Sequence, residues 1–176
     1  MNSAGADLLQ SVVDVARAIF GAEASSVFLL DEPSDSLIFR AVSGRGEDFL
    51  VGRRFPATGG IAGWVVASGD AIVVDDLTRN PAFARDRAES TSYVPDAIMA
   101  APLTHGDRTL GVLEVLDPAP QSRSNLSDLD LLSLFARQAA AALRVVAAEP
   151  APARLDAVGR EEAGDLLRRL QSMLVA

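Results

Sequence analysis

Residues 54–77 constrain the fold most, because their apolar residues change from helical to strand-like spacing within a few positions. Gly59 and Gly60 predict a turn that ends at a helix start. The helix itself is predicted by apolar residues on one face, at Ile61, Trp64 and Val65. Gly69 ends this helix, and the apolar residues 71–74 that follow are typical of a buried strand. The chain therefore needs a short helix that leads directly into a sheet.

Four further strand-like segments occur as two pairs with short turns. Residues 24–30 and 37–42 flank an acidic turn, and residues 97–103 and 109–116 flank a turn around His105. Strands that are joined so closely form antiparallel hairpins. In the second strand, simple alternation predicts one face of Leu37, Phe39 and Ala41 and an opposite face of Ile38, Arg40 and Val42.

Helices are predicted at both ends of this strand set. One covers residues 7–20, with its apolar stripe at Leu8, Val12, Val15, Ala16 and Ile19. The other covers residues 128–148 and has Ser127 as its N-cap. Antiparallel hairpins with terminal helices indicate an α+β fold in which both helices pack on one face of the sheet. The short helix and the long connection 77–95, with a helical turn or two around 82–87, would cover the other face and enclose a pocket.

The remaining residues divide the chain into three parts. One domain is expected over residues 1–148, since its length suits a single hydrophobic core. A stiff Pro/Ala linker follows over residues 149–153, and an amphipathic helix is predicted over residues 154–176.

The absent residue types exclude most common catalytic mechanisms. The chain has no cysteine, no lysine and one histidine, so it lacks a thiolate nucleophile, a Schiff-base lysine and a two-histidine metal site. We therefore expect no enzymatic activity and no metal site. A net charge of −8 disfavours nucleic acid as a partner. No apolar window is long enough to span a membrane and no signal peptide is apparent, so we expect a cytoplasmic protein.

Several segments together resemble a GAF domain over residues 7–146. The matching segments are Phe55-Pro56, Gly60-Ile-Ala-Gly-Trp-Val-Val-Ala-Ser-Gly69, Ile72-Val-Val-Asp-Asp-Leu77, Ile98-Met-Ala-Ala-Pro-Leu103, Gly111-Val-Leu-Glu-Val-Leu116 and Leu126-Ser-Asp-Leu-Asp-Leu-Leu. The order and spacing of these segments carry the resemblance. It implies a six-stranded antiparallel sheet with helices on one side and a small-molecule pocket on the other. It also implies a sensory role, here expected in a bacterial protein, in which dimer helices pass a change to an output domain.

The resemblance implies no particular ligand or cofactor. Members that bind cyclic nucleotides carry an Asn-Lys pair after the sixth strand and a later Phe, where this chain has Leu116, Asp117 and Leu126. Members that attach bilins and the free-methionine-sulfoxide reductases depend on cysteines, which this chain lacks. We therefore expect neither cyclic-nucleotide binding nor cysteine chemistry.

Eight residues are candidates for contact with a ligand in this pocket. They are Phe39, Phe55, Trp64, Val74, Phe83, Tyr93, Ile98 and Glu114. Phe83 and Tyr93 lie in the long connection that would roof the pocket. Trp64 either stacks on a ligand or, as we favour, seals the short helix onto the core. The two glycines before that helix either present amides to an anion or, as we favour, permit the turn.

Polar residues in and near the strands have competing interpretations. Glu114 interrupts the apolar strand 112–116, so its carboxylate must be paired, exposed or functional. An ion pair with an arginine such as Arg40 is favoured over a ligand contact. His105 lies in a predicted turn and is expected to face water rather than bind haem. Asp75, Asp76 and Asp86 lack the regular oxygen spacing of a calcium loop.

The helix over residues 128–148 is apolar on two sides. One stripe comprises Leu129, Leu132, Phe135, Ala139, Leu143 and Val146, and the second comprises Leu131, Leu134, Ala141, Ala142 and Val145. The sheet can cover one stripe, so the first helix, the tail helix or another subunit must cover the other. We predict a homodimer through Leu131, Leu134, Ala142 and Val145 together with the helix over residues 7–20.

These expectations combine into a regulatory, non-catalytic module that binds an unidentified small molecule and signals through dimer helices. The alternative is a ligand-free GAF module used for dimerisation or protein interaction. No kinase, cyclase or DNA-binding segment is apparent, so any output is expected to come from a separate partner protein or from a region outside this sequence.

Overall fold

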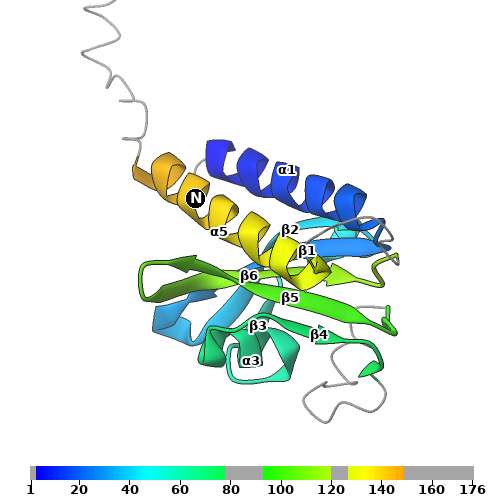
Figure 1. Cartoon of the computed structure of the whole chain (residues 1–176). Coiled ribbons are helices and arrows are strands. Elements are labelled where there is room, and N and C mark those ends of the chain that lie inside the picture. The colour runs from blue at the N-terminus through cyan, green and yellow to red at the C-terminus, as the bar shows by residue number, and fades with distance from the viewer. Residues whose placement is uncertain (1–2, 78–92, 120–126, 149–176) are drawn as a thin grey trace, which may run out of the picture.

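The computed structural model describes residues 3–77, 93–119 and 127–148 (Figure 1). Its elements follow in the order α1 (Ser3–Phe20), β1 (Ala24–Asp31), η1 (Glu32–Ser34), β2 (Ser36–Gly44), α2 (Glu47–Leu50), β3 (Arg54–Pro56), α3 (Gly60–Ser68), β4 (Ile72–Val74), β5 (Ile98–His105), β6 (Arg108–Leu116) and α5 (Asp128–Ala148). The helical turn at 82–87, the linker at 149–153 and the helix at 154–176 were predicted for segments that lie outside the described residues.

The sheet has six strands in the order β3-β2-β1-β6-β5-β4. Every neighbouring pair is antiparallel, and the pairing of β1 with β6 joins the two hairpins at the centre. The predicted hairpins and the six-stranded α+β fold are confirmed. The edge strand β3, which pairs with the first three residues of β2, was not predicted from the residues.

Helices cover the two faces of the sheet in separate layers. Figure 1 shows α1 and α5 side by side on one face and α3 on the other. The first layer encloses an apolar cluster that includes Val27, Leu113 and Leu132. The second cluster, under α3, includes Phe28, Val65 and Val112. The predicted two-sided arrangement is confirmed, and it places adjacent residues of one strand in different clusters because side chains alternate along a strand.

A β-bulge corrects the predicted faces of β2. Ala41 pairs with Val27 whereas Phe39 pairs with Phe28, so Arg40 is an extra residue without a partner in the ladder. The bulge shifts the alternation by one position. Phe39 therefore shares the α3 side with Val42, while Ala41 belongs to the cluster under α1 and α5. The prediction that Phe39 and Ala41 share one face was wrong.

The buried stripe of α1 is also shifted from the prediction. The helix buries Leu9, Val12, Val13, Ala16 and Phe20. Val15 and Ile19, which were assigned to the stripe, are 41% and 43% exposed. The shift arises because α1 contacts both β2 and α5, so its inward direction lies between these two neighbours.

Helix α5 confirms one predicted stripe in part and leaves much of the other exposed. Its start is capped as predicted, since the Asp130 N–H donates to Ser127 Oγ at 3.1 Å. The buried residues are Leu132, Ala136, Ala139, Ala140 and Leu143. On the second stripe, Leu134 and Val145 are 44% and 65% exposed. None of the helices in the described segments is long and apolar enough to cross a membrane.

Candidate ligand-binding site

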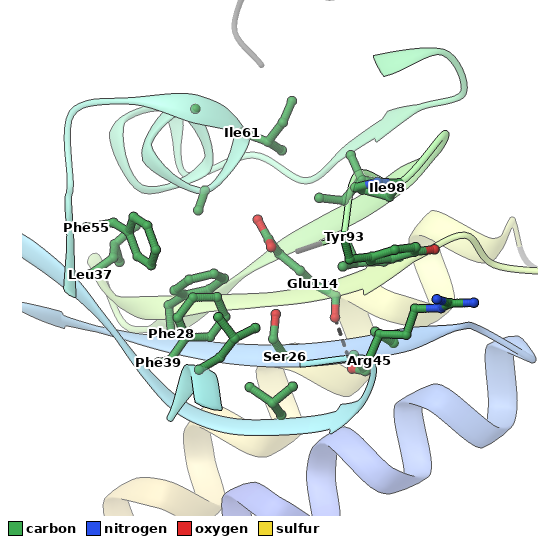
Figure 2. Close-up of a pocket in the computed structure, with 18 of the residues that line it drawn as sticks. Ser26, Phe28, Leu37, Phe39, Arg45, Phe55, Ile61, Tyr93, Ile98 and Glu114 are labelled. Atoms are coloured by element: carbon green, nitrogen blue, oxygen red, sulfur yellow. Dashed lines mark hydrogen bonds between the residues drawn. The ribbon is translucent and has the colours of Figure 1, made fainter. Parts of the chain in front are cut away.

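A cavity of about 140 Å³ lies between the sheet and α3. Alternating residues of β1, β2 and β6 form its floor, and the start of α3 with the preceding turn forms its roof (Figure 2). Its lining residues are Ala24, Ser25, Ser26, Phe28, Leu37, Phe39, Val42, Arg45, Leu50, Phe55, Pro56, Gly59, Gly60, Ile61, Ala62, Tyr93, Pro95, Ile98, Glu114 and Leu116. The lining is predominantly apolar, with few polar side chains, as is usual for small-molecule sites.

Three phenylalanines form one wall of the cavity. The ring centroids of Phe28 and Phe39 are 4.1 Å apart, and Phe55 meets Phe39 edge-to-face at 5.6 Å. Phe39 belongs to this wall because the bulge at Arg40 shifts the strand register by one residue and thereby pairs Phe39 with Phe28. The wall therefore depends on a local break in the strand as well as on the aromatic residues themselves.

The turn before α3 needs glycine for steric reasons. Gly60 has a φ of +73°, a region that favours glycine. A Cβ on Gly63, one turn into the helix, would lie 2.6 Å from the carbonyl oxygen of Ala57. The favoured interpretation of a permissive turn is thus confirmed at Gly60, and close packing adds a second requirement for glycine at Gly63.

Glu114 carries the one carboxyl group among the described residues that line the cavity, and it is 7% exposed. Figure 2 shows its carboxyl group pointing from β6 into the space below Ile61. Among the residues that the structure describes, none donates a hydrogen bond to this carboxylate or forms an ion pair with it. Burial raises the pKa of Glu114 to about 8, because water no longer stabilises the charge.

The predicted ion pair between Glu114 and Arg40 is not formed. In the sheet, Glu114 is level with Ser26 on β1, and Ser26 is level with Val42 on β2. Arg40 lies at the bulge, two residues along from Val42, and its Nε is buried without a hydrogen-bond partner. The bulge therefore removes Arg40 from the position that simple alternation predicts.

A hydrogen bond to Asp117 holds the Tyr93 side chain at the edge of the cavity. Its hydroxyl donates to one carboxylate oxygen of Asp117, and the other accepts the N–H groups of Asp96 and Ala97 at 2.9 Å each. Burial, followed by the hydrogen bond to Asp117, raises the pKa of Tyr93. Asp117 directly follows β6, so the strand that carries Glu114 also holds this aromatic side chain in place.

Arg45 forms the solvent-facing rim beside Tyr93. Its guanidinium carbon lies 4.9 Å from the centroid of the Tyr93 ring, and its Nε donates to Glu23 at 3.3 Å. The Arg45 side chain is 60% exposed, so this part of the lining reaches solvent. Arg45 therefore closes one side of the cavity while its charge is directed towards water and Glu23.

The structure brings together five of the eight candidate residues. These are Phe39, Phe55, Tyr93, Ile98 and Glu114. Val74 is buried in the same apolar cluster but does not line the cavity. Phe83 lies outside the described residues.

The favoured prediction that Trp64 packs the short helix onto the core was wrong. Trp64 is 42% exposed and is absent from the lining. Helix α3 buries Ile61 and Val65, which are one turn apart, and Trp64 is directed away from them. The expectation for His105 is confirmed, since this residue is exposed at the end of β5.

Sequence reasoning missed three informative members of the site. Phe28 and Ser26 alternate on β1, so a face assignment for that strand would have placed them together. Arg45 lies in a glycine-containing connector where no periodic signal exists. No group of three or more His, Asp or Glu within the described ranges is arranged to hold a metal ion, and Asp86 lies outside those ranges.

The comparisons with known proteins agree on the family and the fold. A family model of the GAF domain matches residues 5–143. The structure is similar to the GAF domain of a phosphoenolpyruvate-protein phosphotransferase from Coxiella burnetii, at 19% identity over 82% of this chain and 85% of that chain, with a TM-score of 0.72.

Two further solved structures share this fold. The second GAF domain of DevS from Mycobacterium smegmatis is 17% identical, with 82% of this chain and 96% of that chain covered and a TM-score of 0.65. The free methionine-R-sulfoxide reductase from Neisseria meningitidis, in complex with its substrate, is 23% identical, with 81% of each chain covered and a TM-score of 0.62. The fold therefore occurs in an enzyme as well as in GAF domains of other proteins.

Proposed function

Because the chain belongs to the GAF-domain family, whose members are generally regulatory modules that bind small molecules, we propose that it senses a small molecule in the cavity under α3. Occupancy would be passed through α1 and α5 of a homodimer to an output protein. The proposed role is non-catalytic, since the chain has no cysteine or lysine for catalytic chemistry, and the proposed location is the cytoplasm.

The observation that carries this proposal is a carboxyl group, that of Glu114, which has no partner among the described residues and lies inside a predominantly apolar cavity. A buried carboxyl without a partner is costly, so such a group is retained more readily where it serves a ligand. The cavity volume of about 140 Å³ is close to that of an apolar protein cavity of about 150 Å³ that accepts benzene. The site therefore suits a ligand whose buried part is about one ring in size.

The connection from cavity to helices runs through β6. This strand carries Glu114 on the cavity side and Leu113 and Val115 on the side of α1 and α5. Since the interior is close-packed, a displacement of side chains on one side of a strand also displaces the side chains that pack on its other side. Asp117, the residue directly after β6, accepts the hydrogen bond from Tyr93, so ligand contact at Tyr93 acts on the same strand.

The outer faces of α1 and α5 support dimerisation. Val15 and Ile19 of α1 and Leu134 and Val145 of α5 are large apolar residues with more than two-fifths of their surface exposed. Leu131 and Ala142, also named in the predicted interface, are half-buried. Apolar residues on two adjacent helices are typical of a surface that another subunit covers. The same surface favours the alternative function, in which the module dimerises or binds a protein without any ligand.

Native mass spectrometry of the protein purified from its own host tests the proposal. We expect a dimer that carries a small molecule of reproducible mass. The substitution Val145→Arg should yield monomers, because it places a charge in the proposed interface. Val51→Arg serves as the matched control, since Val51 is 54% exposed at the end of α2. An empty monomer for the unmodified protein would contradict the proposal, and an empty dimer would favour the alternative.

A further inference from the structure

A positively charged group of a ligand would offset the energetic cost of burying the Glu114 carboxylate. Glu114 is 7% exposed, and its carboxyl group receives no hydrogen bond within the described part of the chain. The neighbours level with it in the sheet are Ser26 on β1 and Ala100 on β5, neither of which carries a charge. The protein therefore supplies no cation to this carboxylate from the strands that flank it.

Ser26 provides a second acceptor beside the carboxyl group. It is 4% exposed, lines the cavity and lies directly opposite Glu114 in the register of β1 and β6. An ammonium group carries three N–H donors and no acceptor, so it can donate to the Glu114 carboxylate and to the Ser26 hydroxyl together. A buried carboxylate with an adjacent hydroxyl thus matches a primary amine.

The aromatic residues favour the same kind of ligand. Figure 2 shows Glu114 between Tyr93 on one side and the three phenylalanines on the other. The faces of aromatic rings attract cations, and their surfaces accommodate an apolar body. A single ring fits the cavity volume of about 140 Å³.

An anionic ligand is disfavoured by the distribution of charge. Among the described residues that line the cavity, the titratable groups are Arg45, Tyr93 and Glu114. Arg45 is paired with Glu23 and lies over Tyr93 at the rim, with its side chain 60% exposed. An anion deep in the cavity would meet Glu114, while Arg45, the one cation among the described lining residues, lies at the solvent edge.

We propose that the cavity selects a small organic cation, a primary amine on a body about one ring in size, whose ammonium group pairs with the Glu114 carboxylate and the Ser26 hydroxyl. The inference rests on the proposed function, because it assigns a ligand class to the same cavity. It also predicts a pH dependence. Since the pKa of Glu114 in the empty cavity is about 8, binding below that pH requires loss of its proton. Affinity should therefore rise roughly tenfold per pH unit from pH 6 towards pH 8, and fall again where the amine loses its proton.

Isothermal titration calorimetry with three matched probes tests the inference on the full chain. Benzylamine, benzyl alcohol and benzoate share one ring and differ in charge. At pH 8 we expect benzylamine to bind at least about tenfold more tightly than benzyl alcohol, since a hydrogen bond to a charged group is stronger than a neutral one. Glu114→Gln should remove this preference. Glu32→Gln, which removes the same charge from an exposed turn, should keep it.

Several results would overturn the inference. Equal or tighter binding of benzyl alcohol or benzoate, or a benzylamine preference that survives Glu114→Gln, would refute the amine class while leaving small-molecule binding intact. Absence of binding by all three probes would also refute it, and mass spectrometry of the host-purified protein would then decide separately whether the cavity holds another ligand. A thermal melt checks that the Gln variant is folded. If it is not, the pH dependence in the unmodified protein decides the outcome, and a flat profile from pH 6 to pH 8 would refute the inference.

Discussion

The buried carboxyl group of Glu114 should make the stability of the folded protein depend on pH. Its pKa rises from 4.5 to about 8 on folding because burial removes hydration from the charged form. Between these values the folded state holds a proton that the unfolded state has released. Stability therefore falls as the pH rises from about 4.5 to about 8, and it is unaffected by this group below that window.

The magnitude follows from the width of that window. Each pH unit across it costs about 1.4 kcal/mol. The free energy of unfolding should fall by about 3 kcal/mol between pH 4.5 and pH 7, and by about 5 kcal/mol by pH 9. The substitution Glu114→Gln preserves the shape of the side chain and removes its ionisation. The free energy of unfolding of the variant should therefore lack the pH dependence that Glu114 causes.

Urea unfolding at pH 5, 7 and 9 measures the difference in free energy of unfolding between the Glu114→Gln variant and the unmodified protein. We expect the free energy of unfolding of the Gln variant to rise relative to that of the unmodified protein as the pH rises. At pH 9 it should be higher by several kcal/mol. Glu32→Gln should follow the unmodified protein, because Glu32 is exposed. Parallel pH profiles for the unmodified protein and Glu114→Gln would refute the argument that Glu114 is buried without a partner.

Two further predictions concern the packing and the rim. Leu132→Ala should cost about 2–5 kcal/mol because Leu132 is fully buried, whereas Val51→Ala should cost less than about 1 kcal/mol because Val51 is 54% exposed and lies outside the proposed dimer interface; equal losses in urea unfolding would contradict the assigned burial of Leu132. Tyr93→Phe should cost about 1–3 kcal/mol, because Asp117 loses one hydrogen bond but keeps the two backbone donors. An unchanged free energy of unfolding for that variant would show that the Tyr93 hydroxyl does not hold the rim.

Local patterns determined the elements and the fold class of this protein. Hydrophobic spacing and turn residues were sufficient to place the two hairpins, the short helix after Gly60 and both terminal helices, because these signals depend on neighbours within a few residues. Five of the eight candidate residues line the cavity, including Phe39, Ile98 and Glu114. The family resemblance supplied the strand count, which the structure confirms.

The tertiary structure decided which side each residue faces and which polar groups find partners. The bulge at Arg40 moved Phe39 relative to Ala41, since one extra residue reverses the alternation of a strand. The packing of α3 turned Trp64 towards solvent, and the contact of α1 with both β2 and α5 exposed Val15 and Ile19. Glu114 has no ion pair with any described residue for the same reason, because its surroundings come from β1, β5 and α3 rather than from its neighbours in the chain. These outcomes depend on contacts between distant segments, and local spacing carries no information on how such segments meet.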